Sequence, residues 1–112
     1  MGARSRRKGA AWERELVHRF AKVFGTDHVR RGLQFRDGAE CPDVVAPGFW
    51  IEAKCGKQTN PRAALRQARK ASEGKGLLVL AACKDDRDMP FITMGLDDFL
   101  ELLCEWHSLK VA

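Results

Sequence analysis

Two short apolar runs in the sequence are bounded by charged residues whose spacing suits metal-dependent chemistry. These residues are Asp43, Glu52 and Lys54. The runs lie within residues 41–54 and are separated by Pro47–Gly48, which is the composition of two strands joined by a tight turn. With the turn centred there, Asp43 faces Glu52 across the hairpin, and strand alternation puts Lys54 on the same face as Glu52. Like charges directly opposite each other destabilise a sheet by up to roughly 1 kcal/mol, and a cation between them reverses that effect. The spacing therefore predicts a divalent-metal site with a lysine beside it.

The alternative for this hairpin is a surface element with scattered charges. Charges at the ends of buried strands are costly unless they have a partner or a function. Both strands are apolar on both faces, as expected of strands that are covered on both sides. The apolar residues are Val44, Val45, Phe49, Trp50 and Ile51. These surroundings favour a functional site.

Two motifs carry a family resemblance. Pro42–Asp43 followed by Glu52–Ala53–Lys54 resembles the core motif of the PD-(D/E)XK nuclease superfamily. Upstream, residues 7–10 (RKGA) and 13–16 (EREL) resemble the opening of archaeal-type Holliday junction resolvases, a branch of that superfamily also seen in phages. The resemblance covers residues 7 to about 83. It implies a restriction-endonuclease-like fold and a Mg²⁺-dependent endodeoxyribonuclease that resolves four-way DNA junctions by paired symmetric nicks.

The charged residues suggest how such a nuclease would work. We expect Asp43 and Glu52 to bind Mg²⁺, or Mn²⁺ as a substitute, because hard cations prefer oxygen ligands, with the Ala53 carbonyl and waters completing the shell. A bound metal acidifies the attacking water and offsets charge in the transition state. Lys54 would orient or deprotonate that water, or stabilise the developing charge, and the sequence does not choose among these roles. We expect no small-molecule cofactor.

Glu13 is a further candidate, on a helix predicted from Ala10 to Phe24. Its apolar stripe recurs at helical spacing, and extending the stripe back one turn reaches Glu13, whereas Glu15 falls on the solvated side. In the resolvases that the chain resembles, the glutamate of this opening is part of the active site, so Glu13 would be a metal ligand or position a second ion. The alternative is an ordinary glutamate near a helix start, where it suits the helix dipole.

The charge of the chain points to a polyanionic partner. The 112 residues carry a formal net charge of +5, and phosphate neutralisation by Lys and Arg supplies most non-specific affinity for nucleic acid. We expect one nuclease domain over residues 1–112, with residues 1–9 as a flexible basic arm, and branched DNA as the partner. The expected DNA-binding residues are Arg6, Arg7, Lys8, Arg14, Arg30, Arg31, Arg36 and Lys57.

The remaining pattern predicts a mixed sheet flanked by helices in the order α-β-β-β-α-β-β-α. A short strand near residues 28–30 leads into a basic loop at 31–40, whose role is open. Asn60 and Pro61 mark the start of a helix to about Ser72. The apolar run 77–82 is a central strand, parallel to the second strand of the hairpin. A last strand at 90–94 precedes a closing helix from Asp97 or Asp98 to about His107.

Cysteine usage and hydropathy bear on the compartment. Cys41, Cys55, Cys83 and Cys104 form no CxxC pair, so we expect reduced and mostly buried thiols rather than a zinc site. No apolar run of membrane-spanning length is present, and we expect no membrane partner. The predicted compartment is the cytoplasm, or the host cytoplasm for a phage-encoded chain.

The closing helix carries more apolar surface than the end of so small a domain needs. We expect a two-fold homodimer that uses this surface, because a four-way junction is resolved by two matched nicks. The alternative is that the helix packs on its own sheet. Two other functions also remain open: a restriction-like or nicking endonuclease of the same fold, and a non-catalytic DNA-binding module with structural hairpin charges. The apolar residues of the helix are Leu96, Phe99, Leu100, Leu103 and Trp106.

Overall fold

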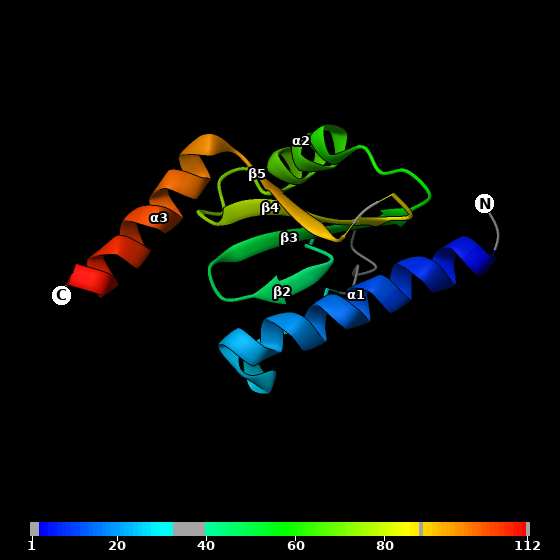
Figure 1. Cartoon of the computed structure of the whole chain (residues 1–112), viewed down its shortest axis with the longest axis horizontal. Coiled ribbons are helices and arrows are strands. Elements are labelled where there is room, and N and C mark those ends of the chain that lie inside the picture. The colour runs from blue at the N-terminus through cyan, green and yellow to red at the C-terminus, as the bar shows by residue number, and fades with distance from the viewer. Residues whose placement is uncertain (1–2, 33–39, 88, 112) are drawn as a thin grey trace.

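A five-stranded sheet lies between two helices, and a third helix extends away from it (Figure 1). The computed structural model describes residues 3–32, 40–87 and 89–111, with side chains from residue 7 onward. The strand order is β1-β2-β3-β4-β5, with β3 and β4 parallel and the other neighbours antiparallel. The elements are α1 (Ala3–Phe24), a 3-10 turn η1 (Thr26–His28), β1 (Arg30–Arg31), β2 (Val44–Ala46), β3 (Phe49–Gly56), α2 (Pro61–Ala71), β4 (Leu78–Asp85), β5 (Phe91–Met94) and α3 (Leu96–Val111). The predicted order of helices and strands is confirmed.

The β2–β3 hairpin has the predicted register. Val44 pairs with Ile51, Val45 with Trp50 and Ala46 with Phe49, so the turn is centred on Pro47–Gly48. Gly48 has a φ of 82°, a conformation that residues with a side chain rarely adopt. The turn residue and the apolar alternation therefore act together to fix the register on which the rest of the sheet depends.

The predicted parallel unit is also confirmed. Strands β3 and β4 pair over eight residues, from Phe49 opposite Leu78 to Gly56 opposite Asp85, and α2 connects them. Asn60 caps α2 by accepting a hydrogen bond from the Ala63 N–H at 3.1 Å. This connection places α2 on the sheet face that also carries the side chain of Glu52.

The two faces of the sheet are covered by different helices. On one face, Trp12 and Leu16 of α1 pack against Ile51, and the indole N–H of Trp12 donates to the Ala82 carbonyl at 3.0 Å. On the other face, Trp50 packs against α2. Because side chains alternate along a strand, Glu52 and Lys54 share the α2 face with Trp50, and Ala53 shares the α1 face with Ile51.

Helix α1 begins at Ala3, seven residues before the predicted start at Ala10. The segment expected as an arm at residues 1–9 is therefore helical from residue 3 onward. Its residues are mainly arginine, lysine and alanine, which favour helix without making an apolar stripe. Hydrophobic periodicity therefore does not predict a helical segment that consists of polar residues.

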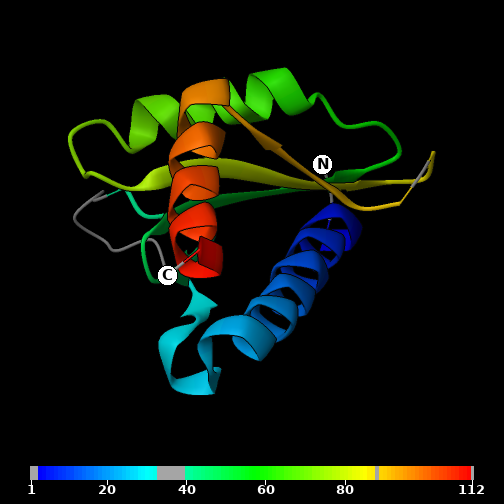
Figure 2. The same cartoon turned by 60° about the vertical axis from the view of Figure 1, so that its left-hand side comes forward.

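Helix α3 extends away from the sheet in Figure 1, and the turned view of Figure 2 brings it in front of the strands. It is longer than predicted, and none of its described side chains is buried. Its first turn is held to the sheet by a hydrogen bond from the Val79 N–H to Asp98 Oδ2 at 3.0 Å. The exposed apolar residues include Leu96, Phe99, Leu100, Leu103, Trp106 and Leu109. The alternative in which this helix packs on its own sheet is therefore wrong.

The cysteines differ from the prediction of mostly buried thiols. Cys83 is fully buried, whereas the thiols of Cys55 and Cys104 are exposed. Cys55 is the second-last residue of β3, and Cys104 lies on α3, which has no buried side chain among its described residues. Separately, no helix within the described ranges combines the length and hydropathy needed to cross a bilayer.

Candidate active site

Asp43 and Glu52 lie at the open end of the β2–β3 hairpin. The last ladder pair is Val44 with Ile51, so Asp43 is the next residue out and faces Glu52. The carboxylate of Asp43 accepts a hydrogen bond from the Ala53 N–H at 2.8 Å through Oδ2. That bond ties Asp43 to β3 where the backbone ladder of β2 has ended. The two carboxylates predicted from the spacing are therefore brought together.

Glu52 is an unusual carboxyl group, because it is only 8% exposed and lies beside a second carboxylate. Its burial, the charge of Asp43 and the hydrogen bond with Asp43 raise its pKa to about 7, against the lowering effect of Lys54. A carboxyl group in this position loses its proton readily only when positive charge is supplied nearby. The arrangement suits a cation beside the two carboxylates better than it suits a settled ion pair.

Two neighbours partly offset the charge of Glu52. Lys54 Nζ lies 3.8 Å from Glu52 Oε2, which is an ion pair without the short contact of a direct hydrogen bond. The indole N–H of Trp50 also lowers the pKa of Glu52. That N–H is buried, and within the described residues it has no hydrogen-bond partner of good geometry. It therefore lowers the pKa of Glu52 by lying close to the carboxylate rather than through a well-formed hydrogen bond. Lys54 and Trp50 offset the negative charge of the carboxylates only in part, so a divalent cation would still be attracted to them.

The carboxylates open into a hollow of about 440 Å³ between the hairpin and α2. The hairpin side contributes Asp43, Glu52 and Trp50, and α2 contributes Gln67 and Lys70. From the sequence, Lys70 was assigned no function, since the helical pattern shows only that it is exposed. The placement of α2 over Glu52, which depends on the parallel connection, is what brings Lys70 to the site.

The arrangement of oxygens fits a hard divalent cation. In an extended strand the N–H and C=O of one residue point to the same side, so the Ala53 carbonyl shares the side on which its N–H meets Asp43. Two carboxylates and one carbonyl suit Mg²⁺, which usually keeps several waters and takes one or two carboxylates from the protein. Over the described parts of the chain, no three side chains of the Asp, Glu, His and Cys types are grouped to bind a metal.

Glu13 does not join this group. It lies on α1, where its Oε1 accepts hydrogen bonds from Arg31 Nε at 3.1 Å and Arg31 Nη2 at 2.9 Å. Arg31 pairs with Val44, and both therefore face α1, whereas Asp43 and Glu52 face α2. Glu15 is not simply solvated either, because it pairs with Lys84 at 2.9 Å. Helical periodicity points Glu13 inward as predicted, but it does not say which face of the sheet lies there.

Gly32 is a residue of this site that the sequence reasoning missed. Its N–H donates to the Asp43 carbonyl at 2.9 Å, and a Cβ at this position would lie 1.7 Å from the Pro42 carbonyl oxygen. No side chain fits there while the two backbones keep this separation. Gly32 thereby fixes the backbone that carries Asp43. The residue type alone gave no signal, because the need for glycine comes from a contact distant in sequence.

The predicted DNA-binding residues are divided between surfaces. Arg7, Lys8 and Arg14 are exposed on α1, and Lys57 is exposed after β3. Arg30 pairs with Val45 and so shares the face of Asp43, whereas Arg31 is engaged by Glu13. The side chain of Arg6 and all of Arg36 lie outside the described residues.

Comparison with known proteins shows a likeness of fold. No family model matches the chain, and no curated protein matches it in sequence. Among solved structures, the chain is similar to Hjc, a Holliday junction resolvase from the archaeal hyperthermophile Archaeoglobus fulgidus, with a TM-score of 0.57 and 24% sequence identity. The match covers 78% of this chain and 72% of the resolvase chain. The chain therefore has the restriction-endonuclease-like fold that the sequence predicts.

The raised pKa of Glu52 predicts how stability depends on pH. Between the ordinary value of 4.5 and about 7, folded Glu52 keeps a proton that the unfolded chain has released. The metal-free protein should therefore lose stability as pH rises through this window, by roughly 3 kcal/mol at most. Glu52→Gln should remove this loss. Urea unfolding in a chelator at about pH 5 and about pH 8 measures it, with Glu101→Gln as the control at an exposed glutamate. An equal pH dependence in wild type and Glu52→Gln would contradict the assignment.

Gly32→Ala should displace Asp43. The added Cβ forces the Pro42 carbonyl away, so Mn²⁺ affinity should drop by about tenfold or more, as when other groups that support metal ligands are lost. Calorimetric titration with Mn²⁺ measures the effect, and thermal unfolding shows whether the fold survives. Gly9→Ala is the matched control, because no atom lies within 4 Å of its Cβ position. Unchanged Mn²⁺ affinity in a folded Gly32→Ala protein would show that Gly32 does not hold the site.

Proposed function

We propose that this protein is a Mg²⁺-dependent DNA endonuclease that resolves four-way junctions by paired nicks. The observation that carries the proposal is the convergence of Asp43, Glu52, the Ala53 peptide and Lys54 at one end of the hairpin. Support also comes from the fold, which is similar to that of an archaeal Holliday junction resolvase. The net charge of +5 suits a phosphate-rich partner.

The chemistry follows from how each group is held. When bound by Asp43 and Glu52, Mg²⁺ would acidify a water and offset charge on the phosphate under attack. Glu52 must be ionised to bind it, and a pKa of about 7 places that step near neutral pH. Asp43 keeps its orientation through the Ala53 N–H. The hairpin therefore presents two oxygen ligands in fixed positions.

Lys54 acts on the phosphate side of the site. Its ammonium group is half-exposed and lies 3.8 Å from Glu52, close enough to feel the carboxylates without being neutralised by a short bond. From this position it would contact the phosphate oxygen that gains negative charge, or orient the attacking water. Arg30 shares this face and adds a second positive charge for the DNA backbone.

Asp43→Asn and Lys54→Ala should each reduce cleavage of a four-way junction by at least about a hundredfold, because each removes a charged group from the reaction. Junction binding in a chelator should remain within a few-fold of wild type, since the hairpin stays packed. Gel assays with and without Mg²⁺ measure cleavage and binding separately. Cleavage by these variants at the wild-type rate would overturn the site.

The choice of DNA substrate distinguishes the proposed resolvase from the alternatives. A resolvase cuts the four-way junction at paired positions and leaves linear duplex and single strands intact, whereas a nicking enzyme also cuts linear duplex. A binding module retains the junction and cuts none of the three. The same gel with these three substrates decides among them.

Paired nicking calls for two active sites, and α3 offers the surface that joins two chains. Its apolar residues are exposed over most of the helix, and contiguous apolar surface of this kind is rare on monomers. A two-fold dimer buries the same surface of both copies and gives two sites in related orientations. We therefore propose a homodimer in which α3 of one chain contacts the second chain.

The α3 surface can be tested by replacing two of its exposed residues. Leu103→Glu together with Trp106→Glu should give the 12.6 kDa mass of one chain in sedimentation, whereas wild type at micromolar concentration should give twice that mass. The charged variant should also nick one strand without its pair. Glu105→Gln, on the polar side of α3, is the control. A wild-type mass of one chain with paired nicking intact would rule the dimer out.

A further inference from the structure

The outer side of α2 carries four positive charges near the active site. Arg62, Arg66, Arg69 and Lys70 are all exposed and follow helical spacing, so a cation occurs at about every turn. We call these four residues the basic face of α2. Like charges one turn apart on a helix repel each other. A surface that keeps them together is suited to a partner of opposite charge.

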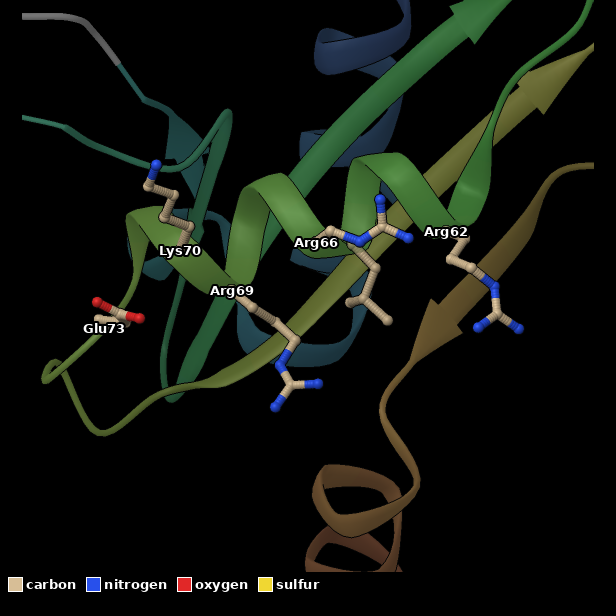
Figure 3. A pocket seen from close by; sticks show the side chains of 6 residues that line it. Arg62, Arg66, Arg69, Lys70 and Glu73 are labelled. Atoms are coloured by element: carbon tan, nitrogen blue, oxygen red, sulfur yellow. The ribbon is translucent and has the colours of Figure 1, made fainter.

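The basic face of α2 has no anionic partner within the described parts of the chain. The ion pairs found there involve other cations, namely Arg19, Arg31, Lys54, Lys84 and Arg87. Figure 3 shows the four side chains extending from α2, with Lys70 on one flank and Arg62 and Arg69 on the other. Their charges are therefore available to an external anion.

These residues line a hollow, and the hollow adjoins the active site. Arg62, Arg66 and Arg69 border an open depression of about 640 Å³ together with Lys70 and Glu73. Lys70 and Glu73 also line the hollow that contains Asp43 and Glu52. Positive charge thus continues from the carboxylates, past Lys70, along α2. A chain of phosphates that reaches the active site would meet this row next.

We propose that the basic face of α2 binds the phosphate backbone of the DNA arm that flanks the cleaved bond. The inference rests on the proposed nuclease function and adds a surface distinct from α1, β1 and Lys57, where the described basic residues expected from the sequence lie. Arg66 and Arg69 hold phosphates outside the reaction centre, and Lys70 makes the contact nearest to it. Arginine suits this task because its guanidinium group binds phosphate oxygens in pairs.

The test measures the salt dependence of junction binding in a chelator, where no cleavage occurs. Arg66→Gln with Arg69→Gln should lower the slope of log affinity against log salt by about 1.8, because each lost phosphate contact removes about 0.9. Between about 50 and about 200 mM salt, affinity should then fall about twelvefold less than for wild type. Arg19→Gln with Lys22→Gln is the control, with the same change of charge on exposed residues elsewhere.

The outcomes separate this inference from the proposed function. A wild-type slope in the Arg66/Arg69 variant, with junction binding and cleavage intact, overturns the role of the basic face and leaves the nuclease standing. An equal reduction in both double variants shows an effect of net charge and also overturns it. If wild type binds no junction DNA, both proposals fail. A change of sedimentation mass in the Arg66/Arg69 variant, with an unchanged slope, would show that the basic face contacts a second chain instead.

Discussion

The proximity of two carboxylates, Asp43 and Glu52, is the constraint on which the rest of the structure depends. It results from a three-pair ladder that a Pro47–Gly48 turn holds in register. A slip of β2 by one residue would turn Asp43 away from α2 and move Val44 and Ala46 out of the core. The unfavourable burial of Glu52 is therefore maintained by the favourable burial of its neighbours Trp50 and Ile51.

Sequence reasoning succeeded where a local pattern and the fold impose the same requirement. The hairpin register followed from a turn and two apolar runs, and the parallel pairing of β3 and β4 followed from the helix between them. Both depend on residues close in sequence. The start of α1 was missed because residues 3–9 have helix propensity without periodicity. Within the site, the sequence predicted that Asp43 and Glu52 face each other, because strand alternation determines that placement.

The remaining parts of the site depend on contacts that no local pattern encodes. The need for Gly32 arises from the carbonyl oxygen of Pro42, which lies close to Gly32 just beyond the paired residues of β1 and β2. The pairing of Glu13 with Arg31 depends on which face of the sheet α1 covers, and so does the question of whether Arg30 or Arg31 faces that helix. Such relations are settled by tertiary packing, so residue type and spacing leave them open.

The attachment of α3 by its first turn has a consequence for how the protein becomes ordered. Beyond the hydrogen bond between Asp98 and Val79, the described helix buries no side chain that would protect its backbone from solvent. Amide hydrogens along the rest of α3 therefore exchange through local opening, at a rate set apart from global unfolding of the sheet. In the proposed dimer that opening is suppressed by mass action, so protection of α3 grows with protein concentration. In the proposed dimer, the sheet and the closing helix are two cooperative units, and the second is completed by another chain.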